Sequence, residues 1–193
     1  AIKSFYKSFF QNQENVRIAS VRAGNVIGGG DWSKDRLVPD CIKAWSSNGS
    51  VDLRNPRSTR PWQHVLDPLS GYIKLAVDMD NNAKFNGESY NFGPPANQNY
   101  SVQDLVEGMS YHWEKVNWKD VSESSDGPYE SGLLKLDCDK AMYDLGWEAA
   151  LDFDETVRMT VEWYKTYYNN PLSAMEVTSS QIDYYETLRS HWK

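Results

Sequence analysis

The sequence predicts an α/β fold built on parallel strands. Its 193 residues are 40% hydrophobic and 24% charged, a composition typical of a globular chain with one good core. Residues 16–21 are rich in β-branched side chains and bounded by turn formers, which predicts a buried strand. Further on, a strand over residues 60–66, a helix beginning at Asp67-Pro68 and a strand over residues 88–92 follow in order. Strand, helix and strand in this order indicate a parallel sheet.

The first elements follow from apolar spacing and turn residues. A helical apolar stripe predicts a helix over residues 2–10, but no capping residue precedes it. We therefore expect that residues belonging before Ala1 are absent. Asp35 is the expected cap of a second helix, and a short strand over residues 51–53 precedes the polar loop 54–59. The apolar positions of this second helix are Leu37, Val38, Cys41, Ile42 and Trp45.

The helix that begins at Asp67-Pro68 takes its cap from Asp67 and has proline in its first turn. Its expected buried stripe is Leu69, Tyr72, Ile73, Ala76 and Val77. Ser101 and Asp104 have the spacing of a capping box, which predicts another helix start. A further strand is expected near residues 116–121.

The last third is helical apart from one long loop. Residues 122–132 are polar and rich in turn formers, and we expect this loop to close over a ligand. Residues 133–136 are strand-like, Asp137 is the expected cap of a short helix, and Gly146 ends that helix. Another helix begins near Phe153 and ends before the segment Asn169-Asn-Pro171. A final amphipathic segment has the apolar residues Ile182, Tyr185, Leu188 and Trp192.

The charge of the chain restricts its partners. A net charge of −7 and a pI near 5.0 argue against nucleic-acid binding, because contacts to phosphates need a basic field. Four arginines nevertheless fall within one stretch, at Arg36, Arg54, Arg57 and Arg60. They suggest a local anion site, and four solvated surface arginines are the alternative.

Two absences in the sequence give further expectations. Cys41 and Cys138 lack the spacing of a zinc site or a redox pair, so we expect both to be reduced and no metal to be bound. No apolar run is long enough to cross a bilayer, and the first residues lack the layout of a signal peptide. A cytoplasmic location without membrane contact is therefore the default expectation.

A glycine-rich stretch follows the first strand. Ala23, Gly24 and Asn25 would stand at the carboxyl end of that strand, where ligands bind in open α/β sheets. Residues 28–30 are three glycines, which allow positive φ and close approach of the backbone to a ligand. A simple loop is the alternative, because the spacing fits neither the dinucleotide fingerprint nor the P-loop.

Several motifs in order carry a resemblance. They are Arg22-Ala-Gly-Asn-Val-Ile-Gly-Gly-Gly-Asp-Trp32, Asp35-Arg-Leu-Val-Pro-Asp40, Arg60-Pro-Trp-Gln-His-Val-Leu66 and Tyr90-Asn-Phe-Gly93. In these motifs the chain resembles the extended short-chain dehydrogenase/reductases that act on nucleotide sugars, and most closely the CDP-glucose 4,6-dehydratases.

The resemblance implies the last strands and helices of a Rossmann-like parallel sheet plus a small α/β substrate-binding lobe. Residues 1–193 would be the C-terminal, substrate-binding portion of such an enzyme. Within it, residues 1–31, 60–80 and 88–93 would complete a Rossmann-type sheet whose N-terminal part is missing.

The resemblance also implies an activity. Enzymes of this kind use NAD to take a hydride from C4 of CDP-glucose, eliminate water across C5 and C6, and return the hydride to C6. The product is a 4-keto-6-deoxy sugar nucleotide used in the biosynthesis of deoxysugars and O-antigen. The family's catalytic Tyr and Lys would lie upstream of Ala1, so this chain alone would be inactive, and a homodimer is possible.

Carried over by motif, the expected site residues are Asn25 and Arg60 at the sugar and diphosphate, Arg36 and Leu37 in the nucleotide pocket, Asn91 as a further polar contact, and the backbone of Ala23 and Gly24 at the nicotinamide. For Asn91, a capped strand end is the alternative. Where the family has a His in the late loop, this chain has Tyr129, which offers a hydroxyl without a positive charge.

Other functions stay open at this stage. Another enzyme on the same scaffold, such as a sugar-nucleotide epimerase or decarboxylase, has the same motifs in outline, and a non-catalytic module that binds nucleotide sugars is also possible. A glycosidase would use carboxylates among Asp31, Asp35 and Asp40, with Trp32 stacking on the sugar. We expect Trp62 and His64 to serve packing rather than catalysis.

Overall fold

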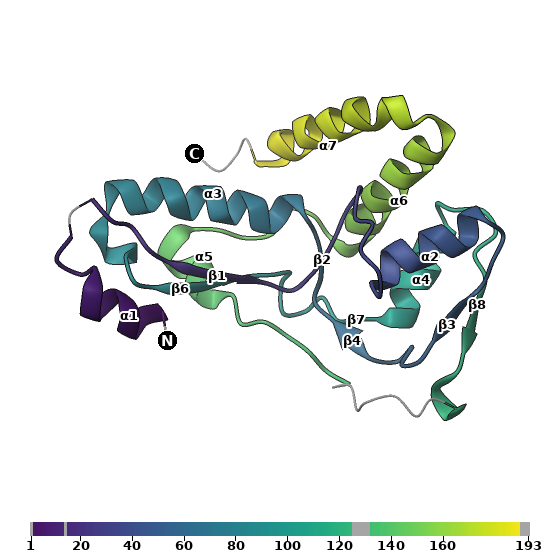
Figure 1. Ribbon diagram of the computed structural model, residues 1–193, viewed down its shortest axis with the longest axis horizontal. Helices are drawn as coiled ribbons and strands as arrows, with labels where there is room; N and C mark the ends of the chain where they lie inside the picture. The colour runs from purple at the N-terminus through teal and green to yellow at the C-terminus, as the bar shows by residue number, and fades with distance from the viewer. Residues whose placement is uncertain (1, 14, 125–131, 190–193) are drawn as a thin grey trace.

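The computed structural model describes residues 2–13, 15–124 and 132–189 (Figure 1). Its helices are α1 (Ile2–Phe9), α2 (Leu37–Ser46), α3 (Leu66–Asn81), α4 (Val102–Ser110), α5 (Asp139–Leu145), α6 (Phe153–Asn169) and α7 (Ala174–Arg189), with short 3₁₀ turns η1 (Ala83–Phe85), η2 (Ser122–Ser124) and η3 (Pro171–Ser173). Its strands are β1 (Ser20–Ala23), β2 (Asn25–Ile27), β3 (Val51–Leu53), β4 (Thr59–Arg60), β5 (Trp62–His64), β6 (Ser89–Phe92), β7 (Tyr100–Ser101) and β8 (Trp118–Asp120). Within these ranges no helix has both the length and the apolar character needed to cross a membrane.

The strands pair mostly in parallel, which confirms the predicted α/β class. The pairs β1–β6, β2–β5 and β3–β8 are parallel, and β4–β7 is antiparallel. Only Gly24 separates β1 from β2, and a Cβ at this position would lie 2.7 Å from the carbonyl oxygen of Pro61. Because glycine has no Cβ, the Pro61 segment can approach the backbone here. The chain can then end its pairing with β6 and begin its pairing with β5. The two strands on either side of α3 do not pair with each other, since β5 lies on β2 and β6 lies on β1.

The chain packs around two main cores. Figure 1 shows α3 along one side of the β1–β6 pair and α2, α4 and α6 gathered at the other end of the molecule. We call the first part the sheet region and the second part the lobe. The sheet region buries Leu75, Met79, Phe85, Tyr90, Phe92, Ala141, Leu145 and Trp147. The lobe buries, among others, Cys41, Ile42, Trp45, Leu105, Val106, Met109, Val157 and Tyr164.

The first strand differs from the prediction in position and burial. Residues 16–19 are not a strand, and β1 begins at Ser20. None of the residues of β1 is fully buried, whereas a buried strand was predicted. Val21 in its centre is 38% exposed. In the described ranges β1 pairs with β6 alone, so its other edge has no neighbouring strand. The β-branched side chains predicted the strand, but they could not supply the neighbours that bury it. The apolar stripe of α1 is exposed as well.

Two of the three aspartates expected to cap a helix, Asp35 and Asp67, do not do so. Asp35 has φ 61° and stands before the N-cap of α2, which is Arg36 and makes no side-chain cap. Asp67 lies inside the first turn of α3 and is fully buried. Its Oδ1 accepts hydrogen bonds from the Ala150 N–H at 2.7 Å and the Tyr185 hydroxyl at 2.9 Å. The Asp67 carboxylate therefore joins distant segments instead of serving its own helix.

The predicted buried stripe of α3 is wrong except at Tyr72, which packs against the core of the sheet region. Leu69, Ile73 and Val77 are 45%, 67% and 55% exposed. The packed face is instead Asp67, Pro68, Gly71, Leu75 and Met79. A Cβ at Gly71 would lie 2.3 Å from the Phe92 ring, so the absence of a side chain there lets β6 approach. This helix has apolar residues on both sides, and close packing at a glycine decides which side is buried.

Three shorter expectations are also corrected. The strand over residues 60–66 is interrupted at Pro61, which has no N–H to donate, and becomes β4 and β5 with different partners. Residues 133–136 form only an isolated bridge from Leu133 to Thr59. The N-cap of α5 is Cys138, while the Asp137 carboxylate accepts a hydrogen bond from the Asp139 N–H at 3.0 Å.

Other local signals are confirmed. Ser101 and Asp104 form the capping box of α4 in both directions. Gly146 ends α5 in the left-handed region with φ 60°. Helix α6 has the predicted extent, and α7 begins at Ala174, earlier than its apolar pattern suggested. Trp192 and Tyr129 lie outside the described residues, as does most of the loop expected to close over a ligand.

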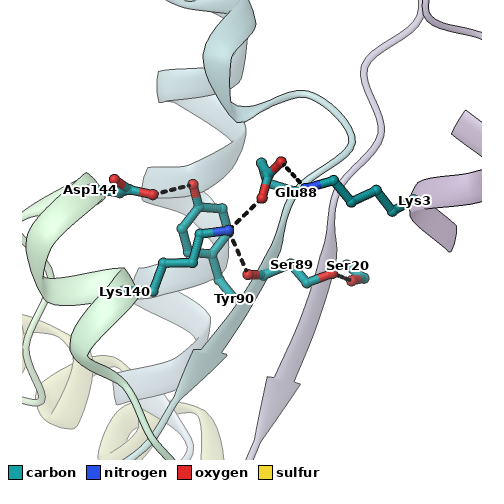
Figure 2. Close-up of polar contacts among 7 residues, drawn as sticks. All are labelled: Lys3, Ser20, Glu88, Ser89, Tyr90, Lys140 and Asp144. Atoms are coloured by element: carbon teal, nitrogen blue, oxygen red, sulfur yellow. Dashed lines mark hydrogen bonds and ion pairs between the residues drawn. The ribbon is translucent and has the colours of Figure 1, made fainter. Parts of the chain in front are cut away.

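A polar network ties the ends of the sheet region together (Figure 2). Glu88, directly before β6, accepts from Lys3 of α1 at 2.6 Å and from Lys140 of α5 at 2.5 Å. These two hydrogen bonds hold the pKa of Glu88 down at about 2. The Tyr90 hydroxyl donates to Asp144 at 3.0 Å, and the Lys140 ammonium lies 4.5 Å from the centre of the Tyr90 ring. The network thus links α1, β6 and α5 in one place.

Candidate functional site

A cavity of about 430 Å³ lies where β2, the start of α2, β3 and β4 meet. The wall combines backbone of the glycine-rich stretch with three arginines and several aspartates. Of the residues expected to bind a ligand, it brings together Gly24, Asn25, Arg36, Leu37 and Arg60. These residues are up to 36 positions apart in sequence, and the folded structure brings them together around one cavity.

Asn25 begins β2 next to the cavity. Its backbone N–H donates to the Pro61 carbonyl at 3.1 Å, which fixes the residue against the neighbouring segment. Among the described residues its side-chain amide has no hydrogen-bond partner. An amide can donate and accept, so Asn25 can serve a sugar hydroxyl or a phosphate oxygen.

Two expected site residues lie outside the cavity wall. Ala23 ends β1, opposite Phe92 of β6, so it stands at the carboxyl end of its strand as predicted. Asn91 donates from Nδ2 to the Asp137 carbonyl at 2.9 Å. This bond ties β6 to the segment before α5, so the geometry favours a structural role for the Asn91 side chain.

Arg60 is the buried cation of the cavity, with 8% of its surface exposed. It lies in β4, opposite Tyr100 of β7, and its Nη1 donates to the Thr59 carbonyl at 2.8 Å. A guanidinium has five N–H donors, so it can bind backbone and an anion together. A charge removed from water gains more from an opposite charge than an exposed one does. Arg60 is therefore suited to hold a phosphate.

Arg36 is the exposed cation at the start of α2. Its Nε lies 3.8 Å from Oδ2 of Asp31. Burial raises the pKa of Asp31, but hydrogen bonds from Ser33 and the charges of Arg36 and Lys43 outweigh it and leave this pKa below its ordinary value. Asp31 is therefore ionised at neutral pH. A glycosidase acid needs the opposite shift, so Asp31 does not fit that role.

The two remaining arginines of the sequence cluster line different cavities. Arg54 lines the same cavity, whereas Arg57 lines a second hollow with Asp120 and Glu123. The first cavity also contains the carboxylates of Asp35, Asp40 and Asp52, so it is mixed in charge rather than basic throughout. A ligand there would meet cations at some of its atoms and acceptors at others.

His64 and Trp62 are buried in β5, as expected of residues that serve packing. His64 is 2% exposed, and burial lowers its pKa to about 4, so it is neutral at physiological pH. Its Nδ1 accepts from the Leu66 N–H at 3.4 Å. Trp62 also forms part of the cavity wall, a position that its sequence context did not reveal.

The three consecutive glycines pack against side chains of the protein itself. A Cβ at Gly28 would lie 2.8 Å from Val65, and a Cβ at Gly29 would lie 1.9 Å from Trp163 of α6. Only Gly30 has positive φ, at 80°. Gly28 also lines the cavity, so close approach of a ligand to its backbone stays a prediction, while the absence of a side chain at Gly28 and Gly29 makes room for Val65 and Trp163. Tyr164 beside Trp163 donates to the Asp31 carbonyl at 2.7 Å, and no motif pointed to this bond.

Comparison with known proteins gives one strong sequence match. The chain is 45% identical over 170 residues to the CDP-glucose 4,6-dehydratase of Salmonella typhimurium, a match covering 85% of this chain and 46% of the relative. No protein-family model matches the chain.

Two solved structures share its fold. The UDP-glucose-4-epimerase of Stenotrophomonas maltophila, with NAD, superposes with a TM-score of 0.70 at 19% identity, over 87% of this chain and 53% of that one. The dTDP-glucose 4,6-dehydratase of Bacillus anthracis, also with NAD, gives 0.62 at 18% identity, over 91% and 51%.

The chain thus has the fold of about half of each of these two structures. Its sequence is similar to that of CDP-glucose 4,6-dehydratase. The chain spans about half the length of the relatives it matches.

Proposed function

We propose that this chain supplies the nucleotide-sugar site of an NAD-dependent CDP-glucose 4,6-dehydratase. The observation that carries the proposal is the single cavity that contains Asn25, Arg36 and Arg60, the residues whose motifs resemble those of that enzyme. The 45% identity to a protein of that activity supports the same substrate.

The residues take complementary parts in binding. Arg60 holds the diphosphate with a buried, permanently charged fork. Asn25, the first residue of β2, hydrogen-bonds to the sugar or its phosphate. Arg36 and Leu37, at the start of α2, line the part of the cavity that takes the nucleotide. Binding at these points fixes the hexose in one orientation for reaction at C4.

The NAD site would be shared with residues that precede this chain. The backbone of Ala23 and Gly24 lies at the carboxyl end of β1, where a cofactor amide can hydrogen-bond without a side chain in the way. When bound, NAD supplies the acceptor and later the donor of the hydride. Residues 1–31, 60–80 and 88–93 would complete the sheet of the cofactor domain, and the open edge of β1 supports this division. A homodimer and a cytoplasmic location complete the proposal.

The test is turnover by the complete enzyme. Incubation with NAD and CDP-glucose should give a 4-keto-6-deoxy product, detected by its absorbance in base and by loss of water in the mass spectrum. UDP-glucose and dTDP-glucose are the matched controls for the nucleobase. A product of unchanged mass would indicate an epimerase, a loss of carbon dioxide from a uronic acid substrate would indicate a decarboxylase, and binding without any product would indicate a binding module.

A further inference from the structure

The segment from Gly28 to Trp32, which we call the glycine loop, joins the cavity to helix α6. Trp163 of α6 covers its backbone, because a Cβ at Gly29 would overlap the indole and one at Gly30 would lie 3.4 Å from it. The indole Nε1 of Trp163 donates to Thr178 of α7 at 2.8 Å, which fixes the ring. The shape of the loop is therefore set by a side chain outside the cavity.

The end of the loop is held by a second residue of α6. Tyr164 is fully buried, and its hydroxyl donates to the Asp31 carbonyl at 2.7 Å. The ring of Trp32 lies edge-on to Tyr164, with the ring centres 5.3 Å apart. Lys43 of α2 donates to the Trp32 carbonyl at 2.9 Å. Hence the loop end is fixed between α6 and α2.

The Asp31 side chain connects the end of the glycine loop to Arg36, which lines the cavity. Its Oδ1 accepts from the Ser33 N–H at 2.9 Å, and its Oδ2 faces the Arg36 guanidinium at 3.8 Å. Arg36 is otherwise a long, exposed side chain at a helix start without a side-chain cap. Its direction therefore depends on the place of the Asp31 carboxylate.

We infer that Trp163 and Tyr164 are positioning residues for the ligand: they fix the glycine loop, and through Asp31 they hold Arg36 over the cavity. Neither residue lines the cavity. This inference rests on the proposed function, since it needs Arg36 to bind the nucleotide.

The variant that isolates the effect is Tyr164→Phe, which removes one hydroxyl and keeps the ring. In the complete enzyme we expect the Kd for CDP and the KM for CDP-glucose to rise about three- to tenfold, the range of one net hydrogen bond. The kcat should stay within about twofold, because the reacting groups are untouched. Tyr168→Phe is the matched control, since Tyr168 packs on Trp32 from the same helix and its hydroxyl has no hydrogen-bond partner among the described residues.

A double-mutant cycle with Arg36→Gln distinguishes positioning from general loosening. If Tyr164 acts through Arg36, the double variant binds CDP as weakly as Arg36→Gln alone. Additive losses, or an unchanged Kd for Tyr164→Phe, overturn the inference. If Tyr164→Phe does not fold, as judged by thermal unfolding, Trp163→Phe takes its place in the cycle. A wild-type enzyme that binds no CDP refutes the proposed function and this inference with it, whereas tight wild-type binding with an unchanged Tyr164→Phe refutes only the inference.

Discussion

The buried carboxylate of Asp67 should make the stability of the chain depend on pH. Burial raises the pKa of Asp67 to about 6 from 3.8, against the opposing hydrogen bonds of Ala150 and Tyr185 and the charge of Arg189. A folded-state pKa above the unfolded value means that folding favours the protonated form. The stabilising contribution is therefore complete below about pH 4 and is lost as the pH rises through about 6.

The size of the effect follows from the two pKa values. At 1.36 kcal/mol per pKa unit, the difference between 3.8 and about 6 corresponds to about 3 kcal/mol. Asp67→Asn keeps the shape and the acceptor oxygen, but it does not titrate. The free energy of unfolding of the wild-type chain, relative to that of Asp67→Asn, should thus fall by up to about 3 kcal/mol between pH 4 and pH 7.

Urea unfolding of both proteins across this range, followed by circular dichroism, measures the difference. Other titrating groups contribute equally to both chains and cancel. Tyr185→Phe is a useful companion, because it removes the hydroxyl that favours the charged form and should enlarge the pH dependence. A difference between wild type and Asp67→Asn that stays constant from pH 4 to pH 7 would refute the reasoning.

Three further outcomes are expected. Arg60→Ala in the complete enzyme should weaken nucleotide-sugar binding by about 1.5 to 3 kcal/mol, the scale of a charge-assisted contact, and an unchanged Kd by calorimetry would contradict its role. Gly29→Ala should destabilise the chain by at least about 1 kcal/mol in thermal unfolding, because the new Cβ overlaps Trp163; Gly132→Ala, where a Cβ meets nothing within 4 Å, is the control. Glu88→Gln should cost about 1 kcal/mol at pH 7, the scale of surface ion pairs. Because the folded pKa of Glu88 is lowered to about 2, this cost should shrink as the pH falls from about 4.5 towards 2, and a cost independent of pH would contradict it.

Sequence patterns located most of the helices but fewer of their contacts. The capping box at Ser101 and the left-handed Gly146 were predicted at the right residue, because each is decided by neighbours a few positions away. Asp35 and Asp67 carried the same kind of signal and did not cap their helices. In the case of Asp67, the carboxylate accepts bonds from segments more than 80 residues away, which no local pattern can show.

The candidate site was found by motif rather than by physical derivation. Resemblance pointed to Asn25, Arg36 and Arg60, and the cavity contains all three. It did not point to Trp163 and Tyr164, which belong to a helix predicted only from its apolar spacing. The three glycines stood out in the sequence. Position 29 needs a glycine because it packs against the ring of Trp163, which is more than 130 positions away.

The sequence by itself determined that the strands belong to a mostly parallel α/β arrangement, and it located local features such as the capping box at Ser101 and the left-handed Gly146. These properties depend on backbone conformation and side-chain chemistry, which each residue and its near neighbours carry. The tertiary structure alone decided that α3 buries its glycine face, that Asp67 loses its contact with water, and that α6 fixes the loop beside the cavity. Burial depends on which distant atoms exclude water, so it is settled only when the whole chain has packed.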